Sequence, residues 1–192
     1  MKFQTSALIL LLIGSVSIMA EDKNRNLFNF ANSENEKAWV NVNDNVMGGV
    51  SDGKFKITQE KTLLFYGNLS LANNGGFSSV RCLPIQFKLQ KNDSICFQVK
   101  GDGREYTINL YTNKNLTAFS YRQSFQTIKD KWVELSFPLE KFIATSFGKV
   151  IQNAGLINPE EINSLGFMLS DKKAGQFQME IKSITVDTKL KD

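Results

Sequence analysis

Short runs of alternating apolar and polar residues, typical of half-buried β-strands, follow one another along most of this chain. Clusters rich in Asn, Asp and Gly separate these runs, as turns do between strands. The runs that we predict to be strands cover residues 54–58, 62–70, 76–83, 94–100, 105–111, 118–127, 132–137, 164–170 and 176–187. Many short strands at regular spacing predict an all-β sandwich or barrel.

A short helix is predicted before the last two strands. Asn158 can cap it, Pro159 suits the first helical position, and Glu160 and Glu161 place acids in the first turn. Strands and helices do not alternate elsewhere, so a nucleotide-binding parallel sheet is not expected. The chain has 192 residues and no repeat or linker, which favours one domain.

The N-terminus is typical of a secretory signal peptide. Lys2 supplies a positive charge, residues 7–19 form an apolar run, and Ala20 suits a cleavage site. An uncleaved anchor is the alternative, but the run is shorter than the roughly 20 apolar residues of a spanning helix. We therefore expect a signal peptide at 1–20, one β-sandwich domain at 21–192, and a secreted or periplasmic protein with no stable membrane insertion after signal removal.

Composition excludes several classes of function. The chain contains no His, which removes Ser-His-Asp and Cys-His nucleophile pairs and His-ligated zinc. Its 23 Lys and Arg and 19 acids are interspersed, so no basic block indicates nucleic-acid binding. Asp44, Asp52 and Asp102 are the candidates for a catalytic carboxylate pair, but nothing in the sequence brings two of them together. We therefore expect no enzymatic activity, no cofactor and no metal site.

The two cysteines, Cys82 and Cys96, could form a disulfide in an exported chain. Alternation argues against this pairing, because Cys82 shares a strand face with Val80 whereas Cys96 lies opposite Ile95 and Phe97. The sequence leaves open whether they are bonded.

Two glycine-rich clusters are candidates for binding. In residues 44–51, Gly48 and Gly49 permit a positive φ or a close backbone approach, which suits either a ligand site or a tight turn. In residues 73–81, Phe77 and Arg81 share a strand face with Ser79 and could stack on a ring or hold a carboxylate. The alternative is that Arg81 is an ordinary exposed residue.

A third cluster, residues 101–106, contains a G-x-G sequence between two predicted strands. The third glycine and the following helix of a phosphate-binding fingerprint are absent. Because loops of a sandwich gather at its ends, we expect at least two of the three clusters to lie together at one rim. There Asp44 and Asp102 would accept hydrogen bonds, Arg81 would donate them, and Trp39 or Phe77 would form an apolar platform.

These clusters, in this order, resemble the complex I intermediate-associated protein 30 family. The resemblance runs from about residue 27 to residue 186. The matching segments are Trp39 with 43–51, 65–70, 73–81, 101–106, 132–135, Phe142, 162–171, 175–177 and 181–184.

The resemblance implies a galactose-binding-like jelly-roll β-sandwich with one or two short helices. It also implies an assembly chaperone for NADH:ubiquinone oxidoreductase. Such a chaperone is a binding protein without established catalytic residues. The candidate residues for ligand or partner binding are Trp39, Asp44, Met47, Gly48, Gly49, Phe77, Arg81 and Asp102.

Two kinds of partner remain open, a protein or a carbohydrate. A protein partner follows from the family resemblance. An exported carbohydrate-binding module is the alternative, because sandwiches of this kind often hold sugars on a sheet face lined by aromatic and amide side chains. The outward-alternating candidates for that face are Phe77, Ser79, Arg81, Gln98, Asn109, Tyr111, Tyr121 and Gln123.

Overall fold

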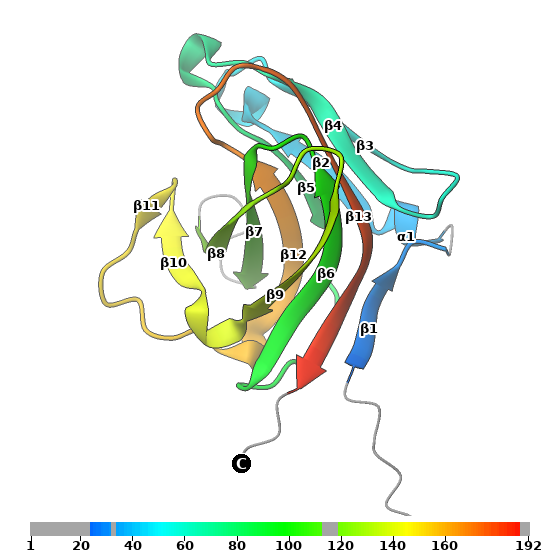
Figure 1. Cartoon of the computed structure of the whole chain (residues 1–192). Coiled ribbons are helices and arrows are strands. Elements are labelled where there is room, and N and C mark those ends of the chain that lie inside the picture. Colours follow the sequence, from blue (N-terminus) through cyan, green and yellow to red (C-terminus); the bar gives the residue numbers. More distant parts are fainter. Residues whose placement is uncertain (1–23, 32–33, 113–118, 189–192) are drawn as a thin grey trace, which may run out of the picture.

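Two antiparallel sheets pack as a sandwich in the computed structural model, which describes residues 24–31, 34–112 and 119–188 (Figure 1). The six-stranded sheet has the order β3-β4-β13-β6-β9, and β1 also pairs with β13. Its strands are β1 (Asn24–Asn29), β3 (Asp52–Ile57), β4 (Leu63–Leu69), β6 (Asp93–Gly101), β9 (Trp132–Pro138) and β13 (Gly175–Thr188).

The seven-stranded sheet has the order β11-β10-β8-β7-β12-β5-β2. Its strands are β2 (Trp39–Asn43), β5 (Ser78–Cys82), β7 (Glu105–Thr112), β8 (Phe119–Gln126), β10 (Ile143–Ser146), β11 (Lys149–Val150) and β12 (Ile162–Leu169). Strands that are distant in the sequence are therefore neighbours in both sheets.

Alternation along each strand decides which side chains fill the space between the sheets. In β6, Ile95, Phe97 and Val99 are buried in the core. The Phe97 ring centroid lies 5.2 Å from that of Phe137 in β9 and 5.1 Å from that of Phe167 in β12. Aromatic rings of both sheets thus meet, and burial of each such side chain contributes about 1.5–3 kcal/mol.

The predicted all-β jelly-roll sandwich is confirmed by this architecture. Each predicted strand is present, as β3 to β9, β12 and β13, although residue 118 lies outside the described residues. The runs β1, β2, β10 and β11 were not predicted to be strands. β11 has only two residues, so its conformation depends on pairing with β10. β1 is mainly polar, and its conformation depends on pairing with β13.

The helical segments are single turns. They are α1 (Glu34–Lys37) and the 3-10 turns η1 (Asp44–Met47), η2 (Ala72–Asn74), η3 (Leu139–Lys141) and η4 (Pro159–Glu161). The predicted helix is η4, where the Asn158 side chain accepts a hydrogen bond from the Glu160 N–H at 3.3 Å. It stops after one turn because Ile162 begins β12. In the described ranges, no helix is long and apolar enough to cross a membrane.

The two cysteines are free and belong to different sheets. Cys82 is buried in the core, as its alternation with Val80 predicts. Cys96 is partly exposed on the outer face of the six-stranded sheet, with its Sγ 3.3 Å from the Ser136 Oγ. The core between the sheets therefore separates the two thiols.

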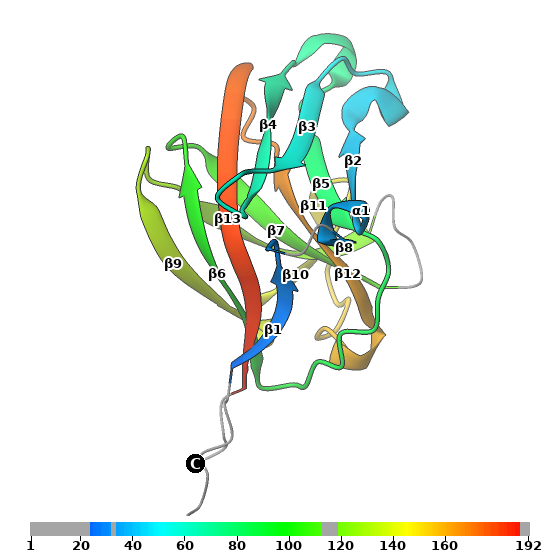
Figure 2. The same cartoon turned by 90° about the vertical axis from the view of Figure 1, so that its right-hand side faces the viewer.

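Strand register defines two ends of the sandwich. At one end, which we call the rim, β2 and β4 finish while β5 and β13 begin. At the other end, Asn24 of β1 pairs with Asp187 of β13 (Figure 2). The described chain thus starts and finishes away from the rim.

Candidate functional site

The rim brings together the loops that carry the three glycine clusters, as predicted. Residues 44–51 join β2 to β3, residues 70–77 join β4 to β5, and residues 102–104 join β6 to β7. The first two loops touch directly through Asp44. The third lies at the same end, because Gly101 pairs with Met179 near the start of β13, while Gly175 pairs with Leu69 at the end of β4.

Asp44 is the centre of the contact between the first two loops. Its side chain is 1% exposed and accepts hydrogen bonds from the Ser51 N–H at 2.9 Å and the Ser51 hydroxyl at 2.6 Å. It also accepts from the N–H groups of Gly76 at 2.6 Å and Phe77 at 3.3 Å. We call this arrangement the Asp44 clamp, and it uses the acceptor capacity that the sequence led us to expect for a ligand.

Glycine is required around the clamp for two different reasons. Gly48 ends the turn η1 with a φ of +89°, a conformation that side-chain-bearing residues rarely adopt. At Gly49, a Cβ would lie 2.3 Å from the Asp44 Cγ, and at Gly75 it would lie 2.5 Å from the Asp44 Oδ2. The glycine pattern therefore serves the burial of a carboxylate.

Hydrogen bonding outweighs burial in setting the pKa values of two rim carboxylates. Burial alone would raise the pKa of Asp44, but the bonds from Ser51, Gly76 and Phe77 hold it below its ordinary value. Burial opposes a low pKa at Asp171 too, and the Arg104 guanidinium overcomes it. Both groups are thus more readily ionised in the folded protein than in the unfolded chain.

Acid is expected to destabilise the fold through these carboxylates. Because their folded pKa values lie below the unfolded ones, their stabilisation is complete above the unfolded pKa of about 4 and disappears as the pH falls through the folded values. Urea unfolding measured at a series of pH values from about 7 to about 2.5 should show the free energy of unfolding decreasing below about pH 4. Asp44→Asn should flatten that decrease, and identical pH slopes for both proteins would contradict the assignment to Asp44.

The third cluster is organised by a buried ion pair. Arg104 binds Asp171 through two parallel hydrogen bonds of 2.9 and 2.6 Å, and the two side chains are 13% and 6% exposed. The guanidinium also donates to the carbonyls of Lys173 and Gln176. It thereby fixes the connection between β12 and β13.

Asp102, which directly follows β6, links β7 to β13. Its carboxylate accepts from the Tyr106 hydroxyl at 3.0 Å, the Gln178 N–H at 2.9 Å and the Arg104 N–H at 3.0 Å. As at Asp44, these acceptor atoms hold the protein's own loops.

Apolar side chains project from the clamped loops into solvent. Val46 is 68% exposed and Met47 is 62% exposed in the turn η1, Val50 is 55% exposed, and Leu71 on the adjoining loop is 45% exposed. We call these four residues the rim patch. Grouped exposed apolar residues on a protein surface indicate an interaction surface.

Two of the predicted binding residues lie elsewhere. Trp39 is 3% exposed in the core, where its ring contacts Phe28 at a centroid distance of 5.0 Å. Arg81 lies on the outer face of the seven-stranded sheet, with its guanidinium 4.6 Å from the Tyr111 ring centroid and its Nε 3.2 Å from the Ser79 Oγ. Neither side chain belongs to the rim patch.

The candidate carbohydrate face is divided by the structure. Strand register places Ser79, Arg81, Asn109 and Tyr111 on the outer face of the seven-stranded sheet. Tyr121 pairs with Leu110 and joins the core, while Gln98 belongs to the other sheet. Phe77 precedes β5 at the rim. Gln123 lies on the core-facing side of β8, where it pairs with Ile108.

Sequence reasoning missed several rim residues. Asp171 lies 67 residues from Arg104, and Ser51 was noted only as the end of a cluster. A pairing over that distance has no local signal, because it depends on the order of strands in the sheets. The apolar residues Val46, Val50 and Leu71 were visible in the loops, but only the structure shows that they are exposed.

The family model that matches this chain is that of complex I intermediate-associated protein 30, over residues 28–181. A mouse protein, "Complex I intermediate-associated protein 30, mitochondrial", is 26% identical over 185 residues, which cover 85% of this chain and 56% of the mouse protein. The "Probable complex I intermediate-associated protein 30, mitochondrial" of Caenorhabditis briggsae is 23% identical, covering 91% of this chain and 57% of the relative. The chain thus spans little more than half the length of these relatives.

Solved structures with this fold include a family 11 carbohydrate-binding module of Clostridium thermocellum in complex with a β-1,3-1,4-mixed-linked tetrasaccharide. It has a TM-score of 0.69 and 16% identity, covering 88% of this chain and 98% of the module. The agarase AgWH50C has a TM-score of 0.61 and 12% identity, covering 87% of this chain and 25% of the enzyme. At these identities the similarity supports the shared fold.

The expected secreted or periplasmic location is contradicted by the relatives. Both curated relatives above, and the matching Drosophila melanogaster protein, are named as mitochondrial. A charged residue, an apolar run and a small residue were the whole basis of the prediction, and such a short pattern is a weak guide to destination. The predicted signal peptide, residues 1–20, lies outside the described residues.

Proposed function

Since this chain belongs to the complex I intermediate-associated protein 30 family, we propose that it binds an assembly intermediate of mitochondrial complex I and does so without catalysis. The names of its relatives describe proteins associated with such an intermediate and located in mitochondria. A binding role needs an accessible surface and no catalytic residues. The rim offers such a surface.

The rim patch is the observation that carries this proposal. Val46 and Met47 are each more than 60% exposed, yet the loop that bears them is fixed by the buried Asp44 clamp. A surface held in one conformation loses little entropy when a partner binds. The unbranched Met47 side chain can adapt to an irregular apolar partner surface. The partner surface that fits is an apolar patch on a complex I subunit.

A double substitution in the rim patch tests this role. Val46→Asp with Met47→Asp places two charges where we expect an apolar contact, so co-purification of complex I subunits with the tagged protein from mitochondria should fall about tenfold or more, as for loss of an interface anchor. Stability should change by no more than about 0.5 kcal/mol, because both side chains are exposed.

The matched control is Phe147→Asp with Val150→Asp. These side chains are 69% and 54% exposed on the β10–β11 hairpin, at the opposite edge of the seven-stranded sheet from β2. They should leave co-purification unchanged. Equal recovery of complex I subunits with the rim variant and the control would refute the rim as the contact surface.

A further inference from the structure

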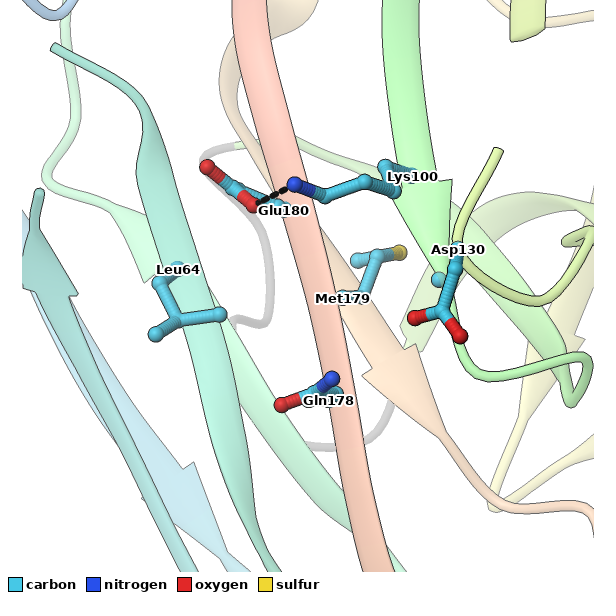
Figure 3. Close-up of a pocket in the computed structure, with 7 residues that line it drawn as sticks. Leu64, Lys100, Asp130, Gln178, Met179 and Glu180 are labelled. Atoms are coloured by element: carbon cyan, nitrogen blue, oxygen red, sulfur yellow. Dashed lines mark ion pairs between the residues drawn. The ribbon is translucent and has the colours of Figure 1, made fainter. Parts of the chain in front are cut away.

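The outer face of the six-stranded sheet contains a trough away from the rim patch. It has a volume of about 270 Å³, close to the lower end of small-molecule sites at roughly 300 Å³. Figure 3 shows its side chains around β13, between β4 and β6. The lining residues are Leu64, Lys100, Gly101, Asp130, Gln178, Met179 and Glu180.

One wall of the trough is a fixed ion pair. The Lys100 Nζ lies 2.6 Å from the Glu180 carboxylate, and the two side chains are 34% and 14% exposed. Glu180 also accepts a hydrogen bond of 2.6 Å from the Thr62 hydroxyl, which is itself bonded to Thr58. This wall is therefore organised before any ligand arrives.

Asp130 and Gln178 provide the remaining polar groups. Their side chains make no hydrogen bond or ion pair with any other described residue. In Figure 3 both lie beside Met179, below the Lys100–Glu180 pair. The trough thus presents the ammonium of Lys100, the amide of Gln178, which both donates and accepts, and the acceptor oxygens of Asp130.

The mixed charges restrict the class of ligand. Lys100 is paired with Glu180, so the Asp130 carboxylate leaves the lining with one net negative charge, which disfavours an anion. A neutral ligand whose hydroxyl groups both donate and accept hydrogen bonds satisfies all three groups.

Aromatic rings lie on either side of the trough. The register pairs Trp132 with Lys100, Lys100 with Glu180, and Tyr66 with Gln178, so these side chains share the outer face. Trp132 is 41% exposed and its ring centroid is 5.0 Å from the Lys100 Nζ. Tyr66 and Trp132 are three strand spacings apart across the sheet, about 14 Å, and are offset by two residues along the strands. A single sugar ring cannot reach both, whereas a short chain of rings can.

We propose that this trough binds a neutral oligosaccharide, with Trp132 as a stacking platform and Lys100, Asp130 and Gln178 as hydrogen-bonding groups. A peptide strand fits less well, because β13 is already paired on both sides, with β4 and β6, and offers no free edge beneath the trough. The site rests on side chains that the proposed complex I contact does not use.

The test is titration of the full chain with millimolar cellotetraose, maltotetraose, laminaritetraose and tetragalacturonate. Binding is measured by calorimetry and by NMR. We expect at least one neutral tetrasaccharide to bind and the anionic tetragalacturonate not to bind. Trp132→Ala should weaken that binding about tenfold, as for the loss of an aromatic contact. Asp130→Ala should weaken it severalfold. Phe147→Ala, an exposed aromatic on another surface, should have no effect.

The outcomes separate this site from the proposed complex I contact. Trough substitutions should leave co-purification of complex I subunits unchanged, and rim substitutions should leave sugar binding unchanged. Absence of binding by every neutral tetrasaccharide would overturn the proposal. So would binding that survives Trp132→Ala, or a Trp132→Ala variant that loses only its protein partners.

Discussion

Replacement of Asp44 by Ala is expected to lower the free energy of unfolding by about 3–5 kcal/mol. The substitution removes an acceptor of four hydrogen bonds and leaves the N–H groups of Ser51, Gly76 and Phe77 in a site where the carboxylate was 1% exposed. Buried donors without partners retain the full cost of losing water. Urea unfolding at pH 7 measures the difference.

Asp52→Ala is the matched control for Asp44. This neighbouring aspartate is paired with Lys54 at the surface, where the two side chains are 63% and 57% exposed. Its removal should change stability by no more than about 0.5 kcal/mol. Comparable losses for the two variants would show that the clamp contributes no more than an ordinary surface carboxylate.

Arg104→Met should have a similarly large effect, about 3–5 kcal/mol of lost stability. Asp171 would keep a charge at a site that is only 6% exposed, and the carbonyls of Lys173 and Gln176 would lose their donor. Chemical unfolding again provides the measurement. Arg25→Met serves as the control and should change stability little, because Arg25 is exposed and donates a hydrogen bond of 3.2 Å to the Lys88 carbonyl at the surface.

A second substitution distinguishes a buried charge from a loss of packing. Adding Asp171→Leu to Arg104→Met removes the remaining carboxylate, so part of the lost stability should return. If the double variant is less stable than Arg104→Met, removal of the remaining carboxylate has restored nothing. The ion pair is then not the source of the effect.

Local pattern was sufficient for most of the fold. Alternation in β6 assigned Ile95, Phe97 and Val99 to the core and Cys96 to the outside, which the structure bears out. The Asn158 cap was also identified from its residue type. Pattern failed at β1 and β11, whose extended conformation comes from partners distant in the sequence.

The rim was harder to predict, because its polar residues interact over long distances in the sequence. Asp44 reaches Gly76, 32 residues away, and Asp102 reaches the N–H of Gln178, 76 residues away. Residue type suggested acceptors that face a ligand, and the structure engages them internally. The trough was missed for the same reason, since Lys100, Asp130 and Glu180 come from separate parts of the chain.

The pairing of β1 with the end of β13 determines how this domain can be joined to other sequences. Asn24 and Asp187 are partners in the sheet, at the pole opposite the rim. A polypeptide fused to either side starts from that shared pole, so it leaves the Val46–Met47 turn unobstructed. The unit from Asn24 to Thr188 can therefore be inserted into a longer protein, or circularly permuted by a short linker between these two residues, with its rim facing outward.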